Sequence, residues 1–123
     1  MAAKIFPHNI GPNCENALRC FFDLSPLEVK VYRDLLENGP GTAVELGRRI
    51  ERDRSTAYRS LSRLVDNDLA VKAIMNREGG GIFHVYEAVE PEQVQLMLRE
   101  TIDAWYEEMQ RVVKKASEAL RTG

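Results

Sequence analysis

The sequence predicts a mainly α-helical protein with one small β-hairpin (class α+β), in which an N-terminal domain is followed by a long helix. Three observations lead to this prediction. Helix start and stop signals enclose three short segments between residues 24 and 66. Two alternating segments around a glycine-rich turn follow, and residues 92–122 contain neither glycine nor proline. We therefore expect an arm with a short helix at 1–23, one domain at 24–89 and a helix at 90–123.

The first helix of the domain is predicted to begin at Pro26 and to extend to about Glu37. Ser25 precedes it as an N-cap, and Glu28 completes a capping box because it lies three residues after the cap. Proline is well tolerated at the first helical position. Two glycines and a proline follow in residues 38–41, and they end the helix.

Two further helices follow at short intervals. Thr42 and Glu45 form a second capping box, which opens a helix that ends at Ile50. Asp53 is the expected N-cap of the next helix, residues 54–66, whose apolar side chains recur at helical spacing. Because only three residues join the two helices, they are predicted to form a helix-turn-helix unit.

After these helices the hydrophobic period changes to that of β-strands. Residues 69–75 and 82–89 alternate loosely between apolar and polar side chains, and the segment between them ends in three glycines. This pattern predicts a two-stranded hairpin with a flexible turn. His84 is expected on the outer face of the hairpin, with no functional role.

The last helix is predicted to begin near Glu92 and to continue to Thr122. Its apolar residues repeat at alternating steps of four and three, which is the heptad spacing of coiled coils. A helix of this length exposes more of that stripe than the domain can cover, so we expect it to pair with a second copy of the chain. The expected dimerisation residues are Leu98, Ile102, Trp105, Met109 and Val112.

Charge is unevenly distributed along the chain. The formal net charge is −2, yet residues 48–77 hold eight basic and four acidic side chains. Residues 87–108 hold seven acidic side chains and one arginine. This distribution excludes a uniformly polycationic protein and indicates a local basic surface on an acidic molecule.

Three helices followed by a hairpin are the order of a winged helix-turn-helix. In that fold the second helix of the unit, here Arg54–Asp66, lies in the major groove of DNA. The hairpin, Lys72–Val89, would lie on the backbone or in the minor groove. The simpler interpretation is that the charged helix face is only a solvated surface, and the order of elements together with the basic segment argues against it. The candidate DNA-binding residues are Arg52, Arg54, Ser55, Thr56, Tyr58, Arg59, Arg63, Lys72 and Arg77.

The sequence offers no catalytic residues, metal ligands or cofactor motif, so we do not expect an enzyme. Two histidines support no catalytic triad, and His8, Cys14 and Cys20 fit no usual zinc spacing. The two cysteines are interpreted as inert thiols, with a redox-sensing disulfide between subunits as the alternative. No apolar run reaches the roughly 18 residues of a membrane span, and we expect a soluble cytoplasmic protein.

Four segments of the sequence resemble TrmB-like archaeal transcriptional regulators, which are related to MarR-like regulators. These segments are Leu24–Tyr32, Leu35–Pro40, Asp53–Leu61 and Gly80–Tyr86, and the resemblance covers about residues 20–110. It implies a DNA-binding regulator, usually dimeric, with Ser55, Thr56, Tyr58 and Arg59 on the DNA side. Larger relatives carry a C-terminal sugar-binding domain that these 123 residues lack, so the sequence leaves a small-molecule effector unknown. The family often has glycine where this chain has Asp68, a residue that tolerates the left-handed conformation.

The predicted function is therefore that of a dimeric regulator that binds double-stranded DNA at a pseudo-palindromic operator. The alternative is a winged-helix module that binds another protein without specific DNA binding. Salt dependence separates the two, because binding to phosphates weakens steeply as salt is added. The operator sequence, the regulated genes and the choice between repression and activation do not follow from the sequence.

Overall fold

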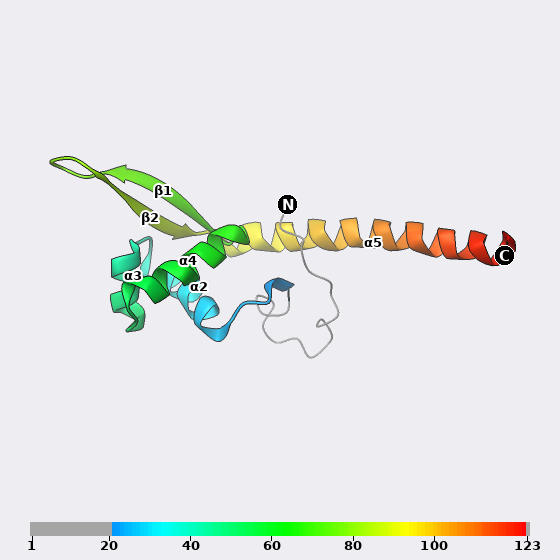
Figure 1. Cartoon of the computed structure of the whole chain (residues 1–123), viewed down its shortest axis with the longest axis horizontal. Helices are drawn as coiled ribbons and strands as arrows, with labels where there is room; N and C mark the ends of the chain where they lie inside the picture. Colours follow the sequence, from blue (N-terminus) through cyan, green and yellow to red (C-terminus); the bar gives the residue numbers. More distant parts are fainter. Residues whose placement is uncertain (1–20, 123) are drawn as a thin grey trace.

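The computed structural model describes residues 21–122, and in it the helices α2 to α4 and one hairpin lie at one end of a long single helix (Figure 1). The elements are α2 (Pro26–Asn38), α3 (Ala43–Ile50), α4 (Arg54–Asp66), β1 (Ala70–Asn76), β2 (Ile82–Ala88) and α5 (Pro91–Thr122). This order confirms the predicted mainly helical α+β class and the winged-helix arrangement. Residues 1–20 of the predicted arm, with His8, Cys14 and Cys20, lie outside the described residues, whereas Phe22 near its end is buried in the core.

Both predicted capping boxes are present. The Ser25 hydroxyl accepts a hydrogen bond from the Glu28 backbone N–H at 3.2 Å, and the Glu28 carboxylate accepts one from the Ser25 N–H at 3.0 Å. Thr42 and Glu45 repeat this exchange at 3.2 and 2.8 Å. Each box satisfies N–H groups that the first helical turn leaves without partners. The starts of α2 and α3 are therefore encoded locally.

The turn between α3 and α4 depends on a close backbone approach at Gly47. A Cβ atom on this residue would lie 2.7 Å from the carbonyl oxygen of Arg52. The Arg52 N–H also donates to the Gly47 carbonyl at 2.8 Å, and Glu51 takes a left-handed conformation with φ of 58°. Only glycine leaves room for this turn, so Gly47 helps to fix how α4 leaves α3.

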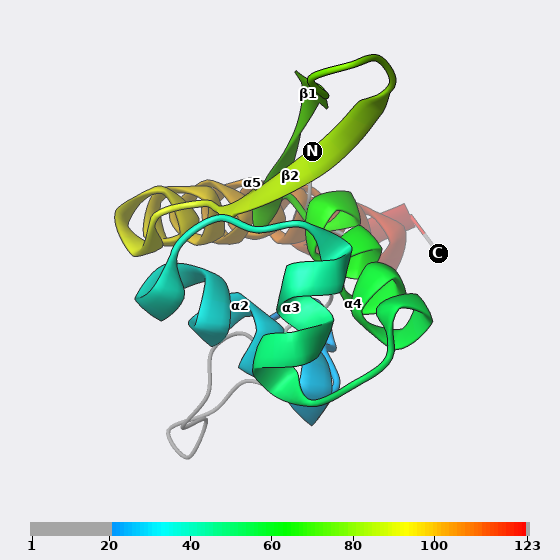
Figure 2. The same ribbon diagram turned by 90° about the vertical axis from the view of Figure 1, so that its left-hand side faces the viewer.

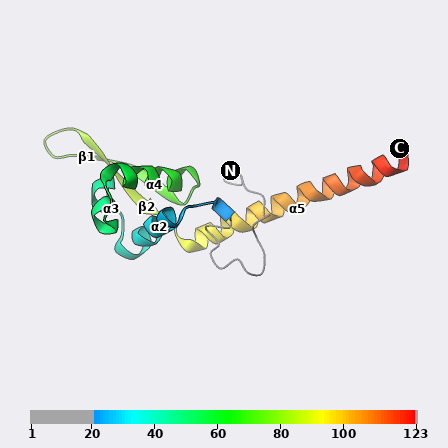
Figure 3. The same cartoon turned by 60° about the horizontal axis from the view of Figure 1, so that its bottom comes forward.

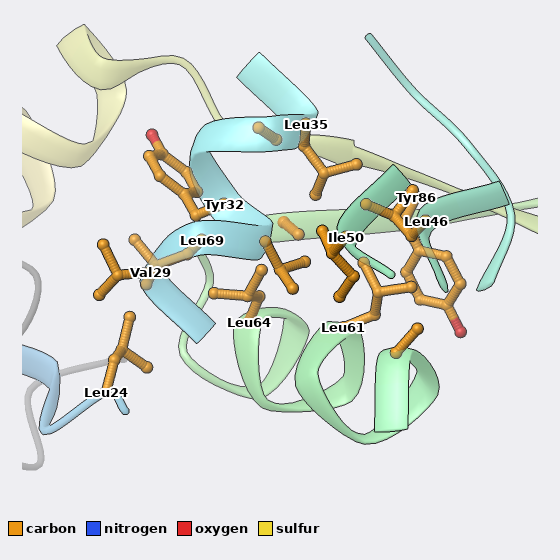
Figure 4. Close-up of a cluster of buried hydrophobic side chains, with 14 of the residues drawn as sticks. Leu24, Val29, Tyr32, Leu35, Leu46, Ile50, Leu61, Leu64, Leu69 and Tyr86 are labelled. Carbon is orange, nitrogen blue, oxygen red and sulfur yellow. The ribbon is translucent and has the colours of Figure 1, made fainter. Parts of the chain in front are cut away.

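The core lies between α2, α3, α4 and the root of the hairpin (Figure 4). Its largest fully buried side chains are Val31, Leu46, Leu61, Leu64 and Leu69. Burying one such side chain contributes about 1.5–3 kcal/mol relative to leaving it in water. The helical spacing that predicted α4 is thus the spacing of its core-facing side.

The hairpin is tied at its root and projects away from the helices (Figure 2). Its strands pair antiparallel from Ala70 opposite Ala88 to Asn76 opposite Ile82. At the root, Gly41 and Tyr86 exchange two backbone hydrogen bonds of 3.0 and 2.8 Å, which join the loop before α3 to β2. At the tip, the glycines at 79–81 all have positive φ values, which this residue adopts without strain.

The residue that departs from the family pattern adopts the expected conformation. Asp68 has a φ of 60°, in the left-handed region, between α4 and β1. The N–H of the next residue, Leu69, donates to the carbonyl of Leu64 at 2.8 Å and closes the end of α4. Aspartate is one of the few residues besides glycine found in this region with some frequency, so the fold tolerates the departure.

Helix α5 joins the domain through its first turns. Val94 is buried in the core, and Met97 and Leu98 pack against it. The Tyr32 hydroxyl of α2 donates a 2.7 Å hydrogen bond to the carbonyl of Val89, directly before α5. Beyond Thr101, every residue of α5 in the described part of the chain is exposed except the half-buried Met109, and the helix continues as a straight rod (Figure 3).

Replacing Tyr32 with Phe is expected to make the protein less sensitive to alkali. Burial raises the pKa of Tyr32 above 10, and the negative charges of Glu90 and Glu92 raise it further. The neutral phenol is therefore favoured by folding, and its contribution is complete below pH 10 and is lost as pH rises through the folded-state value. Unfolding in urea between pH 8 and 11.5 should show a shallower decline for Tyr32→Phe than for the unaltered chain. Equal declines would contradict this assignment.

Candidate nucleic-acid interface

The exposed side of α4 carries the residues predicted to meet DNA. Ser55 and Arg59 are exposed and Thr56 is half-buried, whereas Ala57 and Leu61 point into the core. The guanidinium of Arg59 donates to the Thr56 hydroxyl at 3.4 Å, so these two side chains lie together on one face. This face presents hydrogen-bond donors and a hydroxyl along the first two turns of the helix, the part that can reach base edges in a groove.

The start of α4 is stabilised by its cap. The Asp53 carboxylate accepts a hydrogen bond from the Thr56 backbone N–H at 3.3 Å. Hydrogen bonds from Thr56 hold the pKa of Asp53 below its usual value, and the positive charge of Arg59 lowers it further. The carboxylate therefore stays ionised and helps to order the turn that carries Arg52 and Arg54.

A recess of about 640 Å³ opens between the hairpin and the N-terminal ends of α3 and α4. Arg54 and Tyr58 line it from α4, and Arg77 and His84 line it from the hairpin. Its other lining residues are Thr42, Ala43, Val44, Glu45, Ile82, Phe83 and Tyr86. The recess therefore brings together two predicted arginines that are 23 positions apart in the sequence.

The structure corrects the prediction for His84. This side chain was expected on the outer face of the hairpin, but it is half-buried and lines the recess. Residues on alternate positions of a strand share a face, and the neighbouring Tyr86 on that face is buried against the helices. The alternation predicted which residues share the face of His84 but not which face the helices would cover.

Tyr58 and Arg54 lie close to the buried Tyr86. Burial raises the pKa of the Tyr86 phenol, Tyr58 raises it further, and the positive charge of Arg54 lowers it. Tyr58 itself is 48% exposed. Its hydroxyl can therefore contact a ligand at the mouth of the recess while its ring lies near the domain.

The two predicted wing residues lie at opposite ends of the hairpin. The guanidinium carbon of Arg77 lies 4.9 Å from the centre of the Phe83 ring, a cation–π contact at the tip. Lys72 is exposed on β1, in register with Tyr86 near the root. The hairpin thus carries one positive charge near its root and one at its tip, together with the acidic Glu78 and Glu87.

Two arginines of the basic segment are engaged elsewhere. Arg63 lies 3.5 Å from the carboxylate of Glu28 and donates to the carbonyl of Asp23 at 3.4 Å, away from the recess. Arg49, which contributed to the basic count, forms a 2.7 Å ion pair with Asp34 and donates to the carbonyl of Gly39 at 3.0 Å. The sequence signal could not distinguish these structural arginines from those exposed to a ligand.

Replacing Asp34 with Ala is expected to lower the free energy of unfolding by about 2 kcal/mol, because it leaves the largely buried guanidinium of Arg49 without its charged partner. The side chains of Arg49 and Asp34 are only 26% and 12% exposed, so water replaces the lost pair poorly. Urea denaturation measures the difference, and Glu37→Ala on the exposed side of the same helix is the matched control. Equal stability of the two variants would show that the pair contributes little.

The predicted dimerisation stripe divides into two parts. Leu98 packs against the core of its own domain. Ile102, Trp105 and Val112 are 46%, 38% and 50% exposed, although all three are large and apolar. The flank of the stripe is also apolar, since Tyr106 and Val113 are about 60% exposed. An apolar surface of this extent on a single helix is typical of an interaction surface.

Within residues 21–122, no helix is long and apolar enough to cross a membrane. The same residues contain no cluster of three or more metal-ligating side chains.

Comparison with known proteins finds one matching family and similar proteins in archaea. The family model of the sugar-specific transcriptional regulator TrmB matches residues 18–92. The chain is 33% identical over 101 residues to the uncharacterized protein MJ1503 of Methanocaldococcus jannaschii, covering 82% of this chain and 76% of that protein. It is 34% identical over 97 residues to the uncharacterized protein MJ1082 of the same organism, covering 79% and 80%.

Solved structures show the same fold. A possible transcriptional regulator from Methanosarcina mazei superposes with a TM-score of 0.67 at 19% identity, covering 82% of this chain and 86% of that one. The ST1889 protein of Sulfolobus tokodaii gives a TM-score of 0.58 at 18% identity, covering 81% and 94%. The matched family consists of transcriptional regulators and not of enzymes, as the sequence predicted. On the family match and the identity to its archaeal relatives, the chain belongs to the TrmB family of transcriptional regulators.

Proposed function

We propose that this regulator binds a specific double-stranded DNA site as a dimer, with α4 in the major groove and the hairpin on the flanking backbone or in the minor groove. The observation that carries the proposal is the recess, where Arg54 and Tyr58 of α4 face Arg77 of the hairpin. Arginines from two elements that converge beside an exposed helix face suit a ligand with both phosphates and base edges. Such a regulator would act in the cytoplasm, where the DNA of an archaeal cell lies.

Base recognition is assigned to the exposed front of α4. Arg59 has the fork of donors that pairs with the O6 and N7 atoms of guanine, and Thr56 and Ser55 offer hydroxyls for either base edges or phosphates. Arg59 already lies beside Thr56 at 3.4 Å, so the two would address neighbouring positions of the site. We expect discrimination between sequences to come from these side chains.

Positioning is assigned to the cations around this face. Four exposed cations would contact phosphates on both sides of the groove: Arg52 in the turn before α4, Arg54 at the start of α4, and Lys72 and Arg77 on the hairpin. Contacts of this kind fix the register of a protein on DNA and carry little sequence information. Arg63 belongs to the original prediction, and its contacts with Glu28 and Asp23 make it the weakest candidate.

A dimer is needed because one module covers too little DNA. A single winged helix buries roughly 600–1,000 Å² on DNA, which is small for a specific site. The stripe of the exposed Ile102, Trp105 and Val112 and the half-buried Met109 gives each chain a surface on which a second copy can bind. Two copies related by a twofold axis would read a pseudo-palindromic operator.

The second candidate function is binding of another protein through the hairpin. The observation that favours it is an unusually apolar wing, because Val71, Ile74, Met75 and Ile82 are between 45% and 65% exposed. Such side chains contribute little to phosphate binding and are common in protein interfaces.

Measuring DNA affinity over a range of salt concentrations tests the proposed function. Sites selected from a random DNA pool are titrated at 50–300 mM salt. For about six phosphate contacts, the logarithm of the binding constant should fall with the logarithm of salt with a slope of about −5. No enrichment of any sequence, together with a slope near zero, would reject DNA binding and favour the protein-binding alternative.

A further inference from the structure

We propose that the second copy docks on α5 in the antiparallel direction, so that Met109 of one copy faces Val112 of the other. This inference rests on the dimer in the proposed function and deepens it by giving the orientation and register of the two helices. Three independent features of α5 support it: the distribution of charge along the helix, the sizes of the residues in the stripe, and the chemistry of its two flanks.

Charge changes sign along the free part of α5. Residues 102–108 hold three acidic side chains and no basic one, whereas residues 109–122 hold four basic side chains and one acidic one. A parallel pair would place acidic half against acidic half and basic half against basic half. An antiparallel pair places each acidic half against a basic half, which lowers the electrostatic energy and selects the orientation.

The sizes of the stripe residues fit the same orientation. In an antiparallel pair the steps of three and four along the stripe run in opposite directions in the two copies. The stripe residues that face each other are therefore mirrored about a point between Gln110 and Arg111. Met109 then faces Val112, Trp105 faces Ala116, and Ile102 faces Ala119 of the other copy. Large residues meet small ones at both ends, as close packing of knobs into holes requires. A parallel pair would instead place Trp105 against Trp105 and Ala116 against Ala116.

The flanks of the stripe distinguish the orientations most clearly. On one flank, Tyr106 and Val113 are 59% and 63% exposed. In the antiparallel register Tyr106 of each copy lies beside Val113 of the other, so this contact occurs twice. On the other flank, Glu108 comes opposite Lys115 of the second copy, also twice. In a parallel pair each flank faces the opposite one, so Glu108 would lie beside the apolar Val113. Only the antiparallel arrangement places the apolar flank of one copy against the apolar flank of the other, and acidic side chains against basic ones on the second flank.

The intrachain contact of Glu108 is compatible with this pairing. One carboxylate oxygen of Glu108 accepts from Arg111 at 2.7 Å, and both side chains are more than half exposed. A carboxylate has acceptor sites on both oxygens, so Glu108 can hold Arg111 and meet Lys115 of the second copy at once.

The orientation sets the distance between the two DNA-binding domains. Each domain lies at the N-terminal end of its α5 (Figure 1). In the proposed register, the two Val94 residues lie about 50 Å apart along the rod, at 1.5 Å per residue. This exceeds one turn of DNA (about 34 Å) and falls short of two (about 68 Å), so the offset of each α4 from the start of its α5 sets which of the two half-site spacings applies.

Disulfide cross-linking tests the orientation. Ile102→Cys and Ala119→Cys are made separately in a chain that also carries Cys14→Ser and Cys20→Ser, with a size tag on one of them. In the proposed pair, Ile102 lies beside Ala119 of the other copy, whereas the two copies of Ile102 are about 26 Å apart. A disulfide requires Cα atoms within about 7 Å. We expect the co-refolded mixture to form the tagged–untagged disulfide and neither variant alone to cross-link.

Self-cross-linking of each variant alone would overturn the antiparallel orientation. So would a dimer, seen by sedimentation of the same samples, in which residues 102 and 119 do not cross-link in the mixture. Neither result bears on DNA binding, which is titrated separately. A monomer in sedimentation would instead reject the dimer of the proposed function itself.

Charge reversal provides a second test that keeps the stripe intact. Glu108→Lys should raise the dimer dissociation constant about tenfold, because it creates two like-charge contacts with Lys115. Adding Lys115→Glu to the same chain should restore the original value. Glu107→Lys, one position further round and facing outward, is the matched control and should change it less than threefold. Weakening by Glu108→Lys with no recovery in the Glu108→Lys/Lys115→Glu chain would contradict the pairing.

Discussion

A chain that carries Trp105→Asp and Met109→Lys is expected to be a monomer with a folded N-terminal domain and without tight operator binding. The two changes place charges in the centre of the stripe, where a second copy would have to desolvate them without partners. The domain should stay folded, because α5 contacts its core through Val94, Met97 and Leu98 and not through these residues. Loss of one of two half-sites should reduce operator affinity by about a thousandfold.

Three measurements on the same sample check this expectation. Sedimentation velocity at micromolar concentration reports the oligomeric state, a thermal melt by circular dichroism reports the fold, and a titration with the selected DNA site reports affinity. Ala104→Asp with Gln110→Lys is the matched control, because it introduces the same charges on the opposite side of the helix. Operator affinity that is unchanged in a monomeric variant would show that one module is enough.

Local sequence signals predicted the elements accurately because each start is encoded within four residues. The boxes formed by Ser25 with Glu28 and by Thr42 with Glu45 are both present, with hydrogen bonds of 2.8–3.2 Å. These boxes depend on neighbours along the chain, and a single sequence contains all the information they need. The left-handed conformation of Asp68 followed instead from the resemblance to relatives with glycine there, and that of Glu51 was not predicted.

Contacts between distant segments were beyond such signals. Arg49 and Arg59 contribute equally to the excess of basic residues between positions 48 and 77. In the structure, however, Arg49 is paired with Asp34 at 2.7 Å, whereas Arg59 lies on the exposed face of α4. His84 was placed on the wrong side of the hairpin, because alternation gives two faces and packing decides which is covered. The recess itself joins α3, α4 and the hairpin, so no single segment predicts it.

The heptad stripe is an intermediate case. Its spacing predicted an apolar surface on α5, and the exposure of Ile102 and Val112 agrees with that prediction. The spacing could not show where the domain ends, and Leu98 proved to pack against the core of its own chain. The geometry of the domain, and not the heptad spacing, decides which residues of the apolar stripe are buried in the core and which stay exposed.

Replacing Arg59 with Ala is expected to lower the affinity for the selected DNA site by about tenfold to a hundredfold and to leave random DNA nearly unchanged. The reason is that a bidentate arginine–guanine contact contributes about 1–3 kcal/mol of discrimination and nothing when the base is wrong. Lys72→Ala and Arg77→Ala should weaken binding to all sequences alike and reduce the salt slope by about one unit each, since they would remove phosphate contacts. Arg33→Ala on the exposed side of α2 is the matched control for loss of an arginine remote from the interface.

Titrations of each variant with the selected site and with random DNA, at three salt concentrations, separate these effects. The ratio of the two affinities measures recognition, and the slope against salt measures phosphate contacts. If Arg59→Ala leaves the ratio unchanged while Arg77→Ala lowers it, bases are read by the hairpin and not by α4. The recess between the hairpin and α4 would then bind the edge of the DNA groove, because Arg54 and Tyr58 line it opposite Arg77.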